Sequence, residues 1–129
     1  MQKYSAWALG GIDSAATALL YCGAIGKKNT KRVFLPDDAT PDLDIKYQGL
    51  FVKKFDLLCE KKDITSLVQT MESKCIVKPN DYALVNIKAR TRMILLFGYA
   101  NMTISLVCDA YNKSEMACWL LYKIWGWWC

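Results

Sequence analysis

The stretch Ala8-Leu9-Gly10-Gly11-Ile12-Asp13-Ser14-Ala15 decides how this chain is expected to fold. An alternating apolar segment precedes the glycines at residues 4–9, and a small, apolar run follows them at residues 15–25. This order predicts a strand, a tight glycine turn and a helix. Glycine lets backbone N–H groups approach a ligand closely, and a helix N-terminus adds unpaired N–H donors and a positive dipole end. The stretch therefore predicts an anion site, most naturally for phosphate.

Two side chains of this stretch have alternative interpretations. Asp13 would hold a metal ion rather than the phosphate itself, because two anions need a cation between them. Ser14 could bind the ligand, but it could also be simply the N-cap of the helix. The third glycine of the dinucleotide fingerprint is missing, and no Gly-Lys-Ser/Thr of a Walker loop follows.

Composition places the chain among folded, single-domain proteins. It has 129 residues, of which 53% are hydrophobic and 22% are charged. The net charge of +5 suits a protein that handles polyanionic small molecules, but it is too weak and too dispersed to indicate nucleic acid. The most apolar segment, residues 93–108, is too short and too mixed for a membrane span, and no signal peptide is recognisable.

The cysteines and the missing histidine restrict the chemistry. The chain has six cysteines, none at two-residue spacing, and no histidine. This excludes the common zinc patterns and any histidine-based catalytic triad. Reduced thiols in a cytoplasmic protein are the simplest interpretation.

The rest of the chain alternates between strand-like and helix-like segments. Apolar periodicity predicts further strands at residues 33–35, 63–65 and 103–108, and helices at residues 14–25, 42–61, 67–71, 82–101 and 114–122. Such alternation predicts an α/β fold, Rossmann-like, with a parallel sheet flanked by helices. Ligands of such folds bind at the carboxyl ends of the strands. The glycine turn and the loop at residues 109–113 both follow a strand, so we expect them to be neighbours.

Three segments together resemble one enzyme family. Gly10-Gly11-Ile12-Asp13-Ser14 resembles the pyrophosphate loop of the N-type ATP pyrophosphatases, whose usual form is Ser-Gly-Gly-x-Asp-Ser. Asn86-Ile87-Lys88-Ala89-Arg90-Thr91-Arg92-Met93 and Asn112-Lys113-Ser114-Glu115-Met116-Ala117 look like two motifs of NAD synthetase. The likeness runs from about residue 7 to residue 123 and covers only the first part of the family's usual length. It implies an adenine nucleotide alpha hydrolase-like fold.

The resemblance implies a two-step ligase reaction. The carboxylate of deamido-NAD attacks the α-phosphorus of ATP, pyrophosphate leaves, and ammonia then displaces AMP to give NAD. The family uses Mg²⁺, a hard cation that suits oxygen ligands. With no glutaminase domain in the sequence, ammonia is the expected nitrogen donor. The family's habit of dimerising implies a homodimer, for which the Trp-rich end of the chain offers an apolar patch.

The resemblance also assigns roles to individual residues. Arg90 matches an arginine that contacts deamido-NAD, and Arg92 either positions Arg90 or pairs with a carboxylate. Lys113 either reaches a phosphate or braces its loop. The residues implied for ATP binding are Trp7, Ala8, Leu9, Gly10, Gly11, Ile12, Asp13, Ser14 and Ala110; for deamido-NAD, Arg90 and Lys123; and for the metal, Asp13 and Glu115.

Departures from the family's pattern keep other hypotheses open. Leu9 stands where the family has a serine, Ala110 where a threonine contacts ATP, and Tyr111 where a small residue is usual. Losing a hydrogen bond to a charged group costs about 1.5–3 kcal/mol. One alternative is therefore a catalytically impaired or truncated nucleotide-binding module, with residues 1–129 forming an ATP-binding domain cut short at its C-terminus. Another is a thiolating ATP pyrophosphatase, for which Cys108 would be the candidate cysteine.

Overall fold

The structure is a computed structural model. It describes the backbone of residues 3–7 and 12–108 and the side chains of residues 14–108. Strands and helices alternate along this part of the chain as the sequence pattern predicts. The elements are β1 (Lys3–Trp7), α1 (Ile12–Ile25), a 3-10 turn (Lys27–Asn29), β2 (Thr30–Phe34), α2 (Asp42–Phe55), β3 (Leu58–Lys61), α3 (Thr65–Ser73), α4 (Asp81–Thr103) and β4 (Ser105–Cys108).

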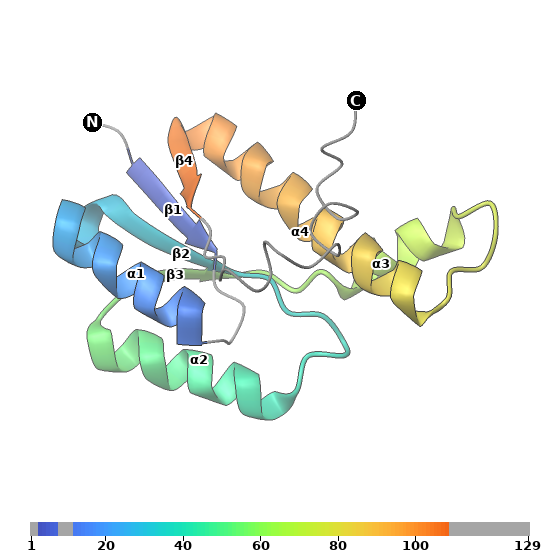
Figure 1. The fold of residues 1–129 in the computed structure, drawn as a ribbon, viewed down its shortest axis with the longest axis horizontal. Helices are drawn as coiled ribbons and strands as arrows, with labels where there is room; N and C mark the ends of the chain where they lie inside the picture. Colours follow the sequence, from blue (N-terminus) through green and yellow to red (C-terminus); the bar gives the residue numbers. More distant parts are fainter. Residues whose placement is uncertain (1–2, 8–11, 109–129) are drawn as a thin grey trace.

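The four described strands form one parallel sheet in the order β3-β2-β1-β4. β1 is central and pairs with β2 on one side and with β4 on the other. The strand order reverses at β1, because the chain moves outward through β2 and β3 and then crosses back to β4. Right-handed crossovers in opposite directions place helices on opposite faces of a sheet. Figure 1 shows this arrangement, with α1 and α2 on one face and α4 on the other.

Alternation along β2 divides the interior into two parts. Val33 faces α4 and joins a cluster of buried side chains contributed by the sheet, α3 and α4. Arg32 faces the opposite way and contacts α2, since successive side chains of a strand point to opposite faces. The buried members of the α4-side cluster are Val33, Leu35, Ile64, Val68 and Leu96.

The boundaries of α1 and α4 follow local signals in the sequence. Gly26 ends α1 at a φ of 88°, a conformation that glycine adopts without strain, and its N–H donates to the Cys22 carbonyl at 3.1 Å. Asn80 caps α4, because its side-chain oxygen accepts from the Ala83 N–H at 2.9 Å. The predicted helices over residues 14–25 and 82–101 are thus confirmed, with ends that differ by two residues or fewer.

The predicted helix over residues 42–61 is too long. α2 ends at Phe55, and Asp56 adopts a left-handed conformation with a φ of 51° and ψ of 56°. The strand β3 then occupies residues that continue the helical spacing of apolar side chains. No glycine or proline marks this boundary in the sequence, and β3 is an exposed edge strand without strand-like alternation in its burial.

The predicted short strand over residues 63–65 is also wrong. The Asp63 carboxylate accepts the Thr65 N–H at 2.9 Å, and α3 begins at Thr65. The Ile64 N–H donates to the Pro36 carbonyl at 2.9 Å. This residue therefore contacts the segment after β2 without forming a strand of its own. The helical prediction over residues 67–71 and the strand prediction over residues 103–108 are confirmed by α3 and β4. The predicted helix over residues 114–122 lies outside the described residues.

Within the described residues, no helix combines the length and apolarity needed to cross a membrane.

Candidate functional site

The candidate phosphate loop follows β1 in the chain, at the edge of the sheet where the parallel strands end, and its residues 8–11 lie outside the described residues. β1 ends at Trp7 and α1 begins at Ile12. The strand-turn-helix arrangement predicted from the sequence is therefore confirmed on both sides of residues 8–11. Asp13 and Ser14 fall in the first turn of α1, whose N-terminal end carries unpaired N–H groups and a positive dipole end. An anion at this edge would be stabilised by the unpaired N–H groups and by the positive end of the α1 dipole.

The loop after β2 reaches the same edge and is closed on itself. Asp37 and Thr40 exchange three hydrogen bonds across a tight turn, and Ala39 donates a fourth to Asp37. The Asp37 N–H donates to the Thr40 hydroxyl at 2.9 Å, and the Thr40 N–H donates to the Asp37 carbonyl at 3.0 Å. The Asp37 carboxylate oxygen Oδ1 accepts the Thr40 hydroxyl at 3.1 Å and the Ala39 N–H at 3.1 Å. Only one oxygen of the carboxylate is used within the loop, and the other, Oδ2, is left for partners from elsewhere.

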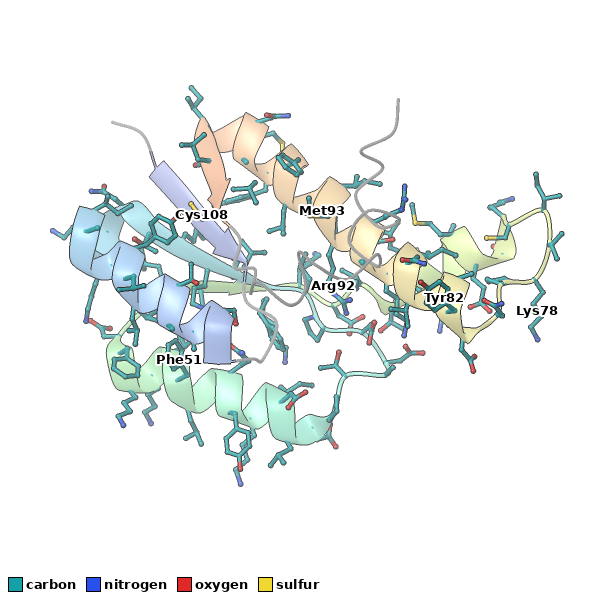
Figure 2. All side chains as sticks on the ribbon, viewed as in Figure 1. Phe51, Lys78, Tyr82, Arg92, Met93 and Cys108 are labelled. Carbon is teal, nitrogen blue, oxygen red and sulfur yellow. The ribbon has the colours of Figure 1, made fainter. Side chains whose placement is uncertain are left out.

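Two cations of α4 converge on that second oxygen. Arg92 donates from Nη2 to Oδ2 of Asp37 at 3.0 Å and from Nε to the Leu35 carbonyl at 2.9 Å. Lys88, one helical turn earlier, lies 3.2 Å from the same oxygen and 3.7 Å from a carboxylate oxygen of Asp38. Figure 2 shows Arg92 at the point where α4 meets the loop after β2. The middle of α4 is thus attached to the loop at the carboxyl end of β2.

The charges of this cluster are matched, and this keeps Asp37 ionised. Burial of the carboxyl group acts to raise its pKa, since the side chain is only 4% exposed. The Lys88 hydrogen bond, the positive charges of Arg92 and Lys88 and the Thr40 hydroxyl together outweigh burial, so the pKa of Asp37 is lowered from its ordinary value of 3.8. The carboxylate is therefore ionised at neutral pH, and it holds its charge to a lower pH than a free aspartate does.

The structure separates the two arginines of the α4 motif. Arg92 is paired with a carboxylate, as one of the two interpretations of this residue expected. Arg90 is exposed, and residues two apart on a helix do not share a face. It follows that Lys88 and Arg92 attach the helix to the sheet, while Arg90 is presented on a different side of α4.

The remaining predicted site residues are only partly described. For Trp7, Ile12 and Asp13 the backbone is placed, and Ser14 is half-buried at the start of α1. The others lie outside the described residues: Ala8, Leu9, Gly10, Gly11, Ala110, Lys113, Glu115 and Lys123. In residues 14–108 no group of three or more acidic, cysteine or histidine side chains is placed to hold a metal ion. The role of Asp13 and Glu115 as metal ligands stays a prediction.

Sequence reasoning missed Asp37 and Lys88. A signal was present, because Lys88 and Arg92 are four residues apart on a helix that packs several apolar side chains against the core. Two cations on the buried side of a helix require an anion. Asp37 and Asp38 follow the buried segment at residues 32–36 and were the nearest candidates in the chain.

The fold and the site together define a class of protein. It is a parallel α/β domain with helices on both faces, a glycine-containing loop between its central strand and first helix, and polar loops gathered at the carboxyl ends of its strands. A family model described as NAD synthase matches residues 8–123. The chain belongs to the NAD synthase family. The resemblance that the three sequence motifs indicated is confirmed.

Relatives and solved structures agree with this membership. The chain is 36% identical over 109 residues to the NH3-dependent NAD(+) synthetase of Saccharolobus solfataricus, covering 83% of this chain and 38% of that protein. Identity is 33% over 117 residues with the enzyme of the same name from Thermococcus kodakarensis, covering 91% of this chain and 45% of the relative. The structure of the NH3-dependent NAD synthetase of Campylobacter jejuni in complex with the nitrate ion superposes with a TM-score of 0.82 at 27% identity, covering 89% of this chain and 49% of that one.

These comparisons confirm the predicted fold class, a parallel α/β fold of the adenine nucleotide alpha hydrolase-like type. The chain spans less than half the length of these relatives.

Proposed function

We propose that this chain supplies the ATP-binding part of an NAD synthetase that amidates deamido-NAD at the expense of ATP. Family membership over residues 8–123 carries the proposal. In the proposed reaction the nicotinate carboxylate attacks the α-phosphorus of ATP, a bond forms to that phosphorus, and pyrophosphate leaves. Ammonia then attacks the resulting acyl adenylate, loses a proton, and displaces AMP to leave the amide.

The proposed ATP site is the glycine loop and the start of α1. Backbone N–H groups of residues 8–14 would surround the phosphates, and the N-terminal dipole of α1 would stabilise their charge. Trp7 would contribute from the end of β1, and Ala110 from the loop that follows β4. Lys113 would contact a phosphate or brace that loop.

The proposed metal is Mg²⁺, held by Asp13 and Glu115. Both are carboxylates, the hard oxygen donors that this cation prefers. Asp13 belongs to the first turn of α1, next to the proposed phosphate site, which supports the assignment. When bound, the ion would neutralise charge that develops on the departing pyrophosphate.

The proposed deamido-NAD contacts are Arg90 and Lys123. Arg90 is exposed on α4, and its helix is fixed against the sheet by Lys88 and Arg92. A guanidinium held on a rigid helix suits recognition of a carboxylate or phosphate. Lys123 would approach the same substrate.

The test is a direct assay of the full chain. The protein is mixed with ATP, Mg²⁺, deamido-NAD and ammonium ion, and both pyrophosphate and NAD are measured. We expect equal amounts of the two products, with NAD formation reduced at least about tenfold by Arg90→Gln. Lys46→Gln, which alters an exposed cation of α2, is the matched control and should leave the rate unchanged. Absence of both products would refute the ligase proposal for this chain.

A second candidate is a nucleotide-binding module without turnover. Leu9 and Ala110 favour it, since both replace hydroxyl donors of the family's ATP site. In that case calorimetry would detect ATP binding although no product forms. Leu9→Ser combined with Ala110→Thr should then tighten ATP binding by about tenfold or more. Unchanged affinity would contradict the proposed position of both residues.

We further propose that the chain forms a homodimer and acts in the cytoplasm. Exposed apolar side chains on α4 support the homodimer, with Ile94 61% and Phe97 49% exposed. Free thiols at the four cysteines of the described residues support the cytoplasmic location. The substrates named above include no nucleic acid and no lipid.

A further inference from the structure

Arg32 is a buried cation that no carboxylate neutralises. It lies in β2 and is 1% exposed, among the most completely buried side chains of the described residues. Nη2 donates to the Gln48 side-chain oxygen at 2.9 Å, and the guanidinium carbon lies 4.6 Å from the centre of the Phe51 ring. Nε and Nη1 are buried and have no hydrogen-bond partner among the described residues. A buried guanidinium with two unsatisfied nitrogens is costly and needs an explanation.

Apart from Gln48 and Phe51, two thiols lie close enough to influence this guanidinium. Arg32 is in register with Cys59 of the neighbouring strand β3, and residues in register on adjacent parallel strands point to the same face of the sheet. Burial lowers the pKa of Arg32, and Cys59 and Cys22 of α1 act in the opposite direction. Cys59 is itself exposed, so a small solute can reach it from solvent. The structure therefore brings one accessible thiol beside a cation that lacks an anion.

We propose that Cys59 is a site of oxidative modification, at which a sulfinate formed on the thiol supplies the anionic acceptor that Arg32 lacks. The oxidant is hydrogen peroxide. The thiol first releases its proton, and the small fraction of thiolate attacks one peroxide oxygen. An S–O bond forms as the O–O bond breaks, and the departing hydroxide takes up the released proton to leave as water. A second equivalent of peroxide converts the sulfenic acid to the sulfinic acid in the same way, with four electrons passing from sulfur to two peroxide molecules.

The thiol itself does not fill this role at neutral pH. The residue is exposed, but partial burial of its sulfur and the negative charge of Glu60 raise the pKa of Cys59, and the nearby Arg32 charge only partly offsets this. The reduced side chain is therefore protonated and brings no negative charge. A sulfinic acid is far more acidic than a thiol, so the oxidised side chain is an anion. Oxidation thus places a negative charge beside a guanidinium that is already fixed by Gln48 and Phe51.

Cys75 provides an internal comparison. It is exposed like Cys59, but it lies beyond α3, and its Sγ donates to the Met71 carbonyl at 3.4 Å. Oxidation there should bring no gain in stability. The inference is independent of the ligase proposal, because it concerns the face of the sheet that packs against α2 and is measured without turnover.

The first experiment treats the full chain with hydrogen peroxide and follows each cysteine by peptide mass spectrometry. We expect two added oxygen atoms on Cys59, and a higher midpoint of thermal unfolding for the oxidised chain than for the reduced chain. Arg32→Met should abolish this increase, whereas Cys75→Ser should preserve it. Failure to find sulfinic acid on Cys59 when Cys75 is oxidised, or the same increase in the Arg32→Met chain, would overturn the proposal.

The second experiment replaces oxidation with a fixed charge. Cys59→Asp introduces a carboxylate of similar size, and Cys59→Asn is its neutral counterpart. With Arg32 present, we expect the ratio of folded to unfolded protein to be about tenfold or more higher for the aspartate variant. In an Arg32→Met or Arg32→Gln background this difference should vanish, and Cys75→Asp against Cys75→Asn should show none in either background. An equal difference with and without Arg32 would refute the pairing.

Discussion

Asp37 is the buried anion on which two cations of α4 converge, and its replacement should be the most damaging polar change in the described residues. Asp37→Asn keeps the size of the side chain but leaves Lys88 and Arg92 without a buried counter-charge. We expect a loss of about 3 kcal/mol in the free energy of unfolding, measured by urea denaturation at pH 7. Asp38→Asn is the control, because Asp38 is exposed and lies 3.7 Å from Lys88, and it should change stability by less than about 0.5 kcal/mol. Equal losses would show that the cluster is not a buried unit.

The same carboxylate should make stability depend on pH. The pKa of Asp37 is lower in the folded chain than in the unfolded chain. Its ionised form therefore adds stability above the unfolded value of about 4, and this contribution is lost as the pH falls through the folded pKa. The stability difference between the unaltered chain and Asp37→Asn should be full at pH 6 and shrink steadily below about pH 4. A difference that stays constant down to pH 2 would contradict the assignment.

Arg32 and Gln48 form a buried polar pair, and replacing both by apolar side chains should raise the free energy of unfolding. Removing Gln48 alone, by Gln48→Met, takes away the only hydrogen bond that the guanidinium makes among the described residues and should lower stability by about 1–3 kcal/mol. Arg32→Met with Gln48→Met removes the buried charge as well and should raise stability by about 1–4 kcal/mol. Thermal and urea denaturation would both register this change of sign. A double variant less stable than the single one would show that Arg32 is already neutralised.

At the scale of elements, two helix ends carry a strained backbone. Ile104 follows the last residue of α4 and Asp56 follows the last residue of α2, and each has a φ of 51°. A β-branched side chain is poorly suited to this left-handed conformation, whereas aspartate tolerates it better. Ile104 is 83% exposed, so replacing it sacrifices little packing.

Ile104→Gly should therefore raise the free energy of unfolding by about 1 kcal/mol, and Asp56→Gly by less. The measurement is urea denaturation of the two variants side by side. A larger gain at Asp56 would reverse the expected order and show that strain at Ile104 is relieved by other contacts.

At the scale of the whole molecule, the outer face of α4 should mediate self-association. Phe97→Glu places a charge in the proposed apolar contact and should weaken dimerisation at least about tenfold. Leu43→Glu, at a comparably exposed position on α2, is the control and should not affect association. Light scattering coupled to size-exclusion chromatography at micromolar concentration measures both. A chain that is monomeric before any substitution would refute the homodimer proposal.

Local sequence was a good guide where the signal was local. Glycine after residue 25 and asparagine before residue 81 marked helix ends because backbone conformation and capping act within a few residues. The end of α2 carried no such signal. Asp56 turns the chain because β3 must pair with β2, a contact between segments more than twenty residues apart. The same pairing explains why Ile64 contacts the segment after β2 instead of forming a strand.

The sequence by itself determined the alternating α/β plan, the glycine loop between β1 and α1, and membership of the NAD synthase family. Each of these depends on periodicity or on residues that are close in the chain. Tertiary structure alone decided that Asp37 pairs with Lys88 and Arg92, that Arg90 lies on another side of α4, and that Arg32 is buried beside Cys59. These are contacts between segments that are distant in the sequence. Their energies depend on how deeply the groups are buried and on which charges are paired, and neither the burial nor the pairing can be determined from the order of residues alone.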